Sequence, residues 1–163
     1  MMHQVIAYVD GSSLGNPGAG GFGIVLRDTA SGATKHIAGN RTDVSNNQME
    51  LLAAIIVLAR LNAPCEITFV SDSKYLVEGW NKWLPGWVAN GWKRAKNKPV
   101  ANAEMWQHLV KLAQRHQVTF EWTKGHSGHT ENEEADRLAR TAAGKLAEGL
   151  VSPKIGWANL VTA

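Results

Sequence analysis

The feature that most constrains the fold is an unbroken run of nine apolar residues in the middle of the chain, Leu51–Ala59. Just before it, Ser45 and Gln48 have the spacing of a capping box, which predicts that a helix begins here and continues to about Leu61. Nine apolar residues are far too few to cross a bilayer, which takes about 20. A helix that is apolar nearly all round is instead buried by other elements, so the chain must fold around it.

Strand-like segments lie on both sides of this helix. Three precede it, and the short connections between them favour antiparallel pairing; we expect these strands at residues 4–9, 22–27 and 33–39, with a turn-rich stretch at 11–21. The fourth strand is reached through the buried helix, which favours a parallel crossover, and we expect it and the fifth strand at residues 67–70 and 118–123. Further helices are expected at 74–79, 103–116 and 130–146. This order predicts an α/β fold with a mixed five-stranded sheet against which the helices pack.

The composition is that of one folded domain. Of the 163 residues, 44% are hydrophobic and 19% are charged, which excludes a disordered chain. The single cysteine, Cys65, excludes an intrachain disulfide and a four-cysteine metal site. Met1–Gln4 leads into the first strand without the basic and apolar segments of a secretory leader. We therefore expect a cytoplasmic, monomeric protein with no membrane contact, one domain at residues 1–146 and a partly ordered tail at residues 147–163.

Two aspartates follow predicted strands that we expect to lie side by side. Asp10 ends the first strand and Asp72 follows the fourth, so both should emerge at the carboxyl edge of the sheet, where α/β folds bind their ligands. Glu50, in the first turns of the buried helix, and Asp136, in the second turn of the last helix, are candidates for the same place. Each acid alone could be a turn residue or an acid favoured near a helix N-terminus. Glu50 argues against this explanation for the set, because its helix is otherwise too apolar to hold an unpaired charge cheaply.

If these carboxylates meet, their repulsion must be relieved. Two charges about 4 Å apart repel by ~4 kcal/mol at an effective dielectric constant of ~20, so either some remain protonated or a divalent cation neutralises them. Carboxylate oxygens are the ligands that Mg²⁺ and Mn²⁺ prefer. Two such ions, about 4 Å apart, are suited to in-line hydrolysis of a phosphodiester. We therefore expect magnesium, which manganese could replace, and two ions when substrate is bound.

Gly18, Gly20 and Gly23 match the spacing of a dinucleotide-binding loop, G-x-G-x-x-G. That motif requires a helix directly after it, whereas the next segment here is a predicted strand. Two interpretations remain: a hairpin turn, or a turn whose backbone N–H groups approach a nucleic acid backbone.

Two histidines lie in a predicted loop, and two asparagines lie at a predicted helix start. His126 and His129 flank a glycine-containing loop and could both be solvated loop residues; a zinc pair is disfavoured because no further histidine or cysteine lies at ligand spacing. His126 is also suited to shuttle protons beside a metal site. Asn46 and Asn47 are typical of a helix start, but their amides could equally hydrogen-bond to base edges or 2′-hydroxyls in a minor groove.

The segment 74–98, called the cationic insert below, is cationic and rich in tryptophan. It contains six basic residues against one acid, although the net charge of the whole chain is only +3, and it holds four of the seven tryptophans. Exposed aromatic rings and lysines together can follow a nucleic acid backbone, which is the function we expect for Trp83 and Trp87. The alternative is an apolar cluster that joins the insert to the domain, the role we expect for Trp80. Pro85 is expected in the first turn of a new short helix.

Six short motifs occur in order along the chain: Tyr8-Val-Asp10-Gly-Ser, Gly15-Asn16-Pro-Gly, Asn46-Asn-Gln-Met-Glu50, Ser71-Asp72-Ser, Trp122-x-Lys124-Gly-His126-x-Gly-His129 and Asn132-Glu-x-x-x-Asp136. Each motif alone is weak, but the ordered set is highly specific and resembles bacterial type 1 ribonuclease H from about Gln4 to Ala143. The resemblance implies a ribonuclease H-like fold with helices on both faces of the sheet and a basic protrusion at about residues 80–98. It also implies a metal-dependent endonuclease that cuts the RNA strand of an RNA–DNA hybrid and leaves 5′-phosphate and 3′-hydroxyl ends.

The resemblance also implies roles for individual residues. Metal binding is implied for four acids, Asp10, Glu50, Asp72 and Asp136, and assistance to proton transfer or product release for His126. Contacts with the RNA minor groove are implied for Gly11, Asn16, Asn46, Asn47 and Gln48, and contacts with the DNA strand for Trp83 and Trp87. In the protrusion, Val88-Ala89-Asn90 replaces a cluster that is frequently basic in the family, which predicts a weaker electrostatic grip on the substrate.

Two other functions fit parts of the same pattern. A module that binds nucleic acid without cutting it would need only the cationic insert, and a DNA resolvase or a 3′–5′ exonuclease could use a similar set of acids. Retained binding without turnover would favour the first function, and release of mononucleotides from an end would favour an exonuclease.

Overall fold

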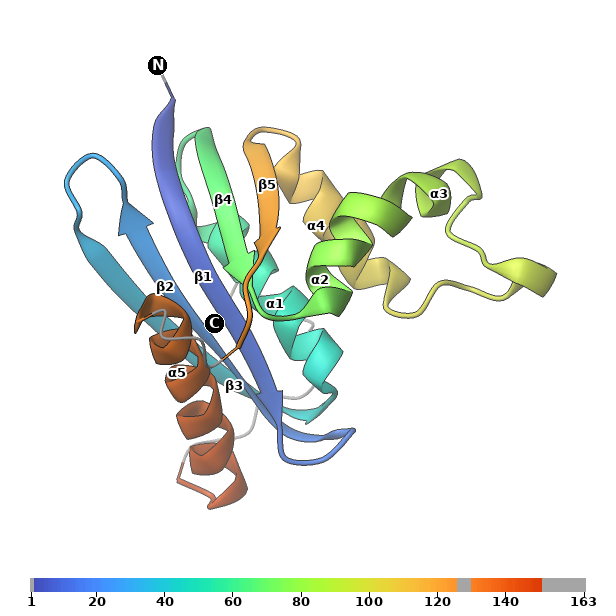
Figure 1. Ribbon diagram of the computed structural model, residues 1–163. Coiled ribbons are helices and arrows are strands. Elements are labelled where there is room, and N and C mark those ends of the chain that lie inside the picture. Colours follow the sequence, from blue (N-terminus) through green and yellow to red (C-terminus); the bar gives the residue numbers. More distant parts are fainter. Residues whose placement is uncertain (1, 126–129, 151–163) are drawn as a thin grey trace.

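The computed structural model describes residues 2–125 and 130–150. Its centre is a five-stranded sheet with the strand order β3-β2-β1-β4-β5. The first three strands are antiparallel, and the last two run parallel to β1: β1 (His3–Ser13), β2 (Gly18–Asp28), β3 (Thr34–Val44), β4 (Cys65–Ser71) and β5 (Gln117–Trp122). Helices cover both faces of the sheet (Figure 1). The predicted α/β fold, the mixed sheet and the parallel pairing of the first and fourth strands are confirmed.

The apolar helix α1 (Asn46–Arg60) lies on one face of the sheet and packs against α4 (Ala103–Ala113). Its predicted capping box is present: the Ser45 hydroxyl accepts a hydrogen bond from the Gln48 N–H, and the Gln48 side chain accepts one from the Ser45 N–H. Every residue from Met49 to Leu58 is buried, as expected for a helix that is apolar nearly all round. Within the described ranges, no helix is both long enough and apolar enough to cross a membrane.

Helix α5 (Thr130–Ala147) covers the opposite face, over β1, β2 and β3 (Figure 1). Its backbone touches β2 at two glycines. A Cβ atom at Gly21 would lie 2.2 Å from the carbonyl oxygen of Ala139, and one at Gly23 would lie 2.1 Å from that of Ala135. Both distances are far inside van der Waals contact, so only glycine fits at these two positions.

The expectation of a turn-rich stretch at residues 11–21 is wrong. β1 continues to Ser13 and β2 begins at Gly18, so only four residues separate the strands. Gly20 and Gly23 are buried within β2, which contradicts both interpretations of the G-x-G-x-x-G spacing, the hairpin turn and the backbone exposed to nucleic acid. These glycines allow helices to pack closely on the strand, a requirement that has no local signature in the sequence.

Strand β3 continues five residues beyond its predicted end at residue 39. The additional residues pair with the glycine-rich end of β2, with Arg41 opposite Gly20 and Val44 opposite Gly18. The register shifts between these two pairs, and Asp43 has a positive φ of 58°. A bulge takes up an extra residue in one strand of a pair, and here it leaves Ser45 in position to cap α1.

The cationic insert follows β4 and projects beyond the edge strand β5 (Figure 1). It consists of α2 (Lys74–Glu78), a π-helical turn η1 (Gly79–Trp83), α3 (Leu84–Ala89) and a short 3₁₀ turn η2 (Ala95–Asn97). Pro85 lies in the first turn of α3, as predicted. The chain nevertheless stays helical before it, because the Leu84 N–H bonds to the Gly79 carbonyl five residues back, which widens the helix just ahead of the proline.

Candidate active site

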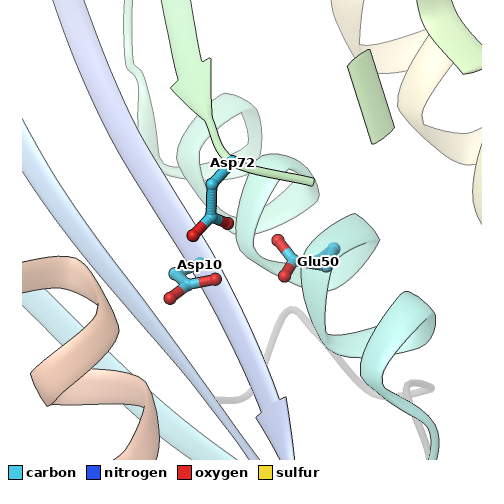
Figure 2. A group of neighbouring side chains, drawn as sticks. All are labelled: Asp10, Glu50 and Asp72. Atoms are coloured by element: carbon cyan, nitrogen blue, oxygen red, sulfur yellow. The ribbon is translucent and has the colours of Figure 1, made fainter. Parts of the chain in front are cut away.

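Three carboxylates meet at the carboxyl edge of the sheet. Asp10 lies near the end of β1, Asp72 directly follows β4, and Glu50 projects from the first turns of α1 (Figure 2). One carboxylate oxygen of each residue lies within 4.8 Å of those of the other two. The structure thus brings Asp10 and Asp72 together, as the pairing of β1 with β4 predicts, and adds Glu50 to them.

Glu50 reaches this place because α1 passes very close to β1. A Cβ atom at Gly11 would lie 2.5 Å from the backbone nitrogen of Glu50 and 2.7 Å from the carbonyl carbon of Met49. The absence of a side chain at Gly11 thus lets the first turn of α1 touch the strand that carries Asp10. The Gly11 N–H also donates a hydrogen bond of 2.9 Å to Asp10 Oδ1, which orients that carboxylate.

The electrostatics of the cluster oppose full ionisation. The exposed fraction is 4% for Asp10 and 7% for Glu50. Burial, followed by the negative charge of Asp72, raises the pKa of Asp10 to about 8. Burial also raises the pKa of Glu50 well above its ordinary value, and the charges of Asp10 and Asp72 add to this effect. At neutral pH the three acids are therefore not all charged unless a cation compensates them.

The cluster fits a divalent metal ion. Glu50 Oε2 is buried and has no hydrogen-bond partner among the described residues, and an unpartnered buried oxygen is costly. A cation between the three carboxylates would contact this oxygen and offset their mutual repulsion. The donor set consists of oxygen alone, as hard divalent cations prefer.

Comparisons with known proteins agree with this chemistry. The sequence model of the RNase H family matches residues 2–144. A ribonuclease H from Mesorhizobium japonicum is 48% identical over 153 residues, which cover 94% of this chain and 85% of that protein. One from Rhizobium johnstonii is 51% identical over 139 residues, which cover 85% of this chain and 91% of that protein. The chain belongs to the ribonuclease H family.

Solved structures of ribonuclease H proteins share the fold. LC9-RNase H1, a type 1 RNase H with the type 2 active-site motif, is similar with a TM-score of 0.79 and 30% identity, over 88% of this chain and 74% of that chain. The N-terminal RNase H domain of rv2228c from Mycobacterium tuberculosis is similar with a TM-score of 0.70 and 26% identity, over 91% of this chain and 99% of that chain. The resemblance inferred from the six motifs is thereby confirmed.

The fourth acid implied by the ribonuclease H resemblance lies beside the cluster. Asp136, on α5, is close enough to Asp10 that its hydrogen bond and its charge contribute to the raised Asp10 pKa. It is nevertheless not one of the three residues whose oxygens lie within 4.8 Å of one another. Its Oδ2 instead accepts a hydrogen bond of 3.0 Å from Arg140 Nε, one helical turn later. His126, the fifth predicted catalytic residue, lies outside the described residues.

Asparagines that the ribonuclease H resemblance assigns to RNA contacts gather at the start of α1. Asn16 lies in the turn between β1 and β2, and its Oδ1 accepts a hydrogen bond of 3.3 Å from the Asn46 N–H. Asn16, Asn46 and Asn47 are exposed. The structure thus brings the Asn16 side chain to the start of α1, although 30 residues separate Asn16 from Asn46.

Gln48 differs from these asparagines because its amide is used within the protein. Its Oε1 accepts a hydrogen bond from the Ser45 N–H, and its Nε2 donates one of 3.3 Å to Asn102 Oδ1. Asn102, which we did not predict, also donates to the Tyr75 hydroxyl. An asparagine directly before a helix is a local signal for a capping residue, but its contact with Gln48 joins positions 54 residues apart.

The two tryptophans assigned to the DNA strand differ in exposure. Trp83 exposes 41% of its surface, and its ring centre lies 6.0 Å from that of Trp87. Trp87 is half-buried and packs on the fully buried Trp106, with 5.2 Å between ring centres. Trp80 packs on Phe120 at 5.0 Å, as expected for a residue that joins the insert to the domain.

Trp122 contacts the backbone of Asp72, which we did not predict. Its indole N–H donates a hydrogen bond of 3.1 Å to the backbone carbonyl of Asp72, and the Lys74 ammonium lies 5.4 Å from the centre of its ring. Its place in the Trp122-x-Lys124-Gly motif was the one signal in the sequence. The contact itself depends on the pairing of β5 with β4, which places Trp122 opposite Ser71.

Proposed function

We propose that this protein is an endonuclease that hydrolyses the RNA strand of RNA–DNA hybrids and leaves 5′-phosphate and 3′-hydroxyl ends. The observation that carries this function is the meeting of Asp10, Glu50 and Asp72 in a chain that belongs to the ribonuclease H family. Three closely spaced carboxylates that cannot all ionise alone form a place where a divalent cation and a phosphodiester can bind together.

The proposed cation is Mg²⁺, which Mn²⁺ can replace, with two ions present when substrate is bound. Cations held there supply the Lewis acidity that in-line hydrolysis of a phosphodiester requires. The protein itself holds the ligand oxygens in place. The Gly11 N–H orients Asp10, the buried first turns of α1 position Glu50, and the end of β4 positions Asp72.

Asp136 and His126 complete the proposed catalytic set. Asp136 lies beside Asp10, and its ion pair with Arg140 is an exposed pair within one helix. Because such surface pairs are weak, the carboxylate can turn toward a cation at little cost. His126 is assigned to proton transfer or product release, since the ordinary histidine pKa of ~6.5 suits both tasks.

The hybrid is proposed to lie between the start of α1 and the protrusion. The exposed amides of Asn46 and Asn47 support contact with the wide minor groove, where 2′-hydroxyls and base edges are accessible. The exposure of Trp83 favours contact with the DNA strand, and its ring packs against the ring of Trp87. The full set assigned to the RNA strand is Gly11, Asn16, Asn46, Asn47 and Gln48.

The test compares a labelled RNA–DNA hybrid with an RNA duplex and a DNA duplex of the same sequence, each with Mg²⁺ or with EDTA. We expect internal cuts in the RNA strand of the hybrid alone, and loss of cleavage in EDTA. Equal attack on all three substrates, cleavage that survives EDTA, mononucleotides released from an end, or binding without turnover in any divalent metal would contradict the proposal. Asp10→Asn and Asp72→Asn should abolish cleavage while the circular dichroism spectrum stays unchanged.

Residues 1–146 are proposed to form the complete ribonuclease H domain, with residues 147–163 as a tail. In the described part of the chain, Leu146 is the last buried residue and α5 ends at Ala147. A chain that ends at Leu150 should therefore keep both the kcat and the thermal stability of the full chain. A clear loss of either would give the tail a part in the domain.

A further inference from the structure

A cavity of about 410 Å³ lies between α2, η1 and the edge strand β5. Its lining combines two lysines, an acid, an amide and two aromatic rings: Lys74, Glu78, Asn81, Lys82, Phe120 and Trp122. The volume is within the range of small-ligand sites, about 300–1,000 Å³. None of these residues has a part in the function proposed above.

The cavity adjoins the carboxylate cluster. Lys74 follows Asp72 by two residues, at the start of α2. From the other wall, the indole N–H of Trp122 donates to the backbone carbonyl of Asp72 over 3.1 Å. A nucleic acid strand whose scissile phosphate lies at Asp72 therefore has its neighbouring nucleotides within reach of both side chains.

Trp122 presents an exposed ring at the wall of this cavity. Its exposed fraction is 48%, although its N–H is held by Asp72 and its ring orientation is therefore fixed. The Lys74 ammonium lies 5.4 Å from the ring centre. A fixed aromatic ring beside a cation is the combination with which proteins bind single-stranded nucleic acid, because the ring stacks on a base while the cation meets a phosphate.

The charge of the cavity favours an anionic occupant. Two lysines face one acid, and Lys82 Nζ lies 3.5 Å from Glu78 Oε1 with both side chains exposed. Such a surface pair is weak, so Lys82 can exchange its partner for a phosphate. Asn81 fixes the width of the cavity, because its Nδ2 donates a hydrogen bond of 3.1 Å to the Phe120 carbonyl and so ties η1 to β5.

We propose that this cavity binds one unpaired nucleotide of the RNA strand, next to the hybrid segment that is cut. The proposal rests on the function proposed above and adds to it a preference for hybrids whose RNA continues as a single strand. The nucleotide is unpaired because a base within a duplex is stacked between its neighbours and offers no face to Trp122. It belongs to the RNA because that strand passes Asp72, whereas the DNA strand is assigned to Trp83 and Trp87.

The experiment measures Kd by fluorescence anisotropy for the cleavage-deficient Asp10→Asn protein. All ligands contain the same hybrid core. One is blunt, two carry a short RNA overhang at the 3′ or the 5′ end, and the last carries a DNA overhang. We expect one of the two RNA overhangs to tighten binding at least about fivefold, as stacking of one base would, and the DNA overhang to give no gain. Equal Kd values for the blunt hybrid and both RNA-overhang hybrids would overturn the proposal.

Variants made in the Asp10→Asn background locate the overhang. Trp122→Ala and Lys82→Gln should each reduce the overhang advantage, whereas Trp122→Phe, which keeps a ring but loses the N–H that fixes its orientation, should retain part of it. Glu78→Gln should enlarge the advantage, because it frees Lys82. Lys35→Gln, an exposed lysine of β3 at the opposite edge of the sheet, is the control and should change nothing. An advantage that survives both Trp122→Ala and Lys82→Gln would place the overhang elsewhere and overturn the site.

Cleavage of the blunt hybrid by the unmodified protein in Mg²⁺ reports separately on the proposed function. If the blunt hybrid is cut and no RNA overhang improves binding, the nucleotide site alone fails. If no hybrid is cut, the proposed function fails, and the nucleotide site fails with it.

Discussion

Gly11 and Glu50 are in backbone contact: a Cβ atom at position 11 would lie 2.5 Å from the backbone nitrogen of Glu50. This contact holds α1 against β1, and it is the reason why Glu50 reaches Asp10 and Asp72. The arrangement of the three acids therefore depends on the absence of a side chain at a neighbouring residue.

Gly11→Ala should lower both the stability and the activity of the protein. The added methyl group must displace the backbone of α1, and overpacking of this kind costs about 1–3 kcal/mol. A shift of ~1 Å at Glu50 can lower the cleavage rate by as much as ~10²-fold. Thermal unfolding and single-turnover cleavage measure the two effects.

The matched control for this change is Gly144→Ala on α5. Nothing lies within 4 Å of a Cβ atom added at Gly144, so alanine should raise the free energy of unfolding by about 0.5–1 kcal/mol through its higher helix propensity. Cleavage should be unchanged. A Gly11→Ala protein with normal cleavage would show that α1 can adjust without moving Glu50.

Without divalent ions, the free energy of unfolding should fall as the pH rises from about 4 to about 8. The pKa of Asp10 is raised from 3.8 to about 8 in the folded protein, so in this range the folded state holds a proton that the unfolded state has lost. Stability contributed by a raised pKa is complete below the unfolded pKa and is lost as the pH passes the folded one. Urea unfolding in EDTA across this range measures the decline, and a flat profile would contradict it.

Two changes should reverse this loss of stability at pH 8. Asp10→Asn removes one of the opposing charges and should raise the free energy of unfolding in EDTA by at least about 1.4 kcal/mol, the equivalent of one pKa unit. Saturating Mg²⁺ should stabilise the unmodified protein, because a ligand that binds only the folded state favours it. Mg²⁺ should stabilise Asp10→Asn less than the unmodified protein.

Arg140→Gln should lower the Mg²⁺ concentration needed for half-maximal cleavage. The change removes the cation that pairs with Asp136 Oδ2 at 3.0 Å, which leaves more negative charge beside the cluster; we expect about a two- to threefold decrease, the size of a weak exposed ion pair. The control is Arg137→Gln, which removes an arginine of the same helix that pairs with Glu134 instead of Asp136. A higher Mg²⁺ requirement in Arg140→Gln would instead mean that the arginine orients Asp136 for metal binding.

Trp83→Ala and Trp87→Ala should separate substrate binding from stability. Trp83 is exposed, so its loss should raise KM several-fold while kcat and the thermal midpoint stay nearly unchanged. Trp87 packs on Trp106 and Trp92, so its loss should also lower the free energy of unfolding by about 2 kcal/mol. If the KM of Trp83→Ala is unchanged, its ring has no part in binding the hybrid.

Local sequence patterns predicted most of the helices and strands of this protein and the elements that carry its acids. The capping box at Ser45 and the apolar run behind it predicted a buried α1, because capping and periodicity depend on residues within one or two turns. The connection through α1 predicted parallel pairing of β1 with β4, and with it the meeting of Asp10 and Asp72.

Contacts between distant elements were decided only in the tertiary structure. Gly21 and Gly23 of β2 serve the close approach of α5, Asp136 of α5 lies beside Asp10 but outside the group of three acids, and Trp122 binds the carbonyl of Asp72. Each of these depends on how closely and at what angle two elements pack, and that is set by the side chains of the whole core. Residue order along the chain therefore determined which groups could reach the sheet edge, and packing determined which of them meet there.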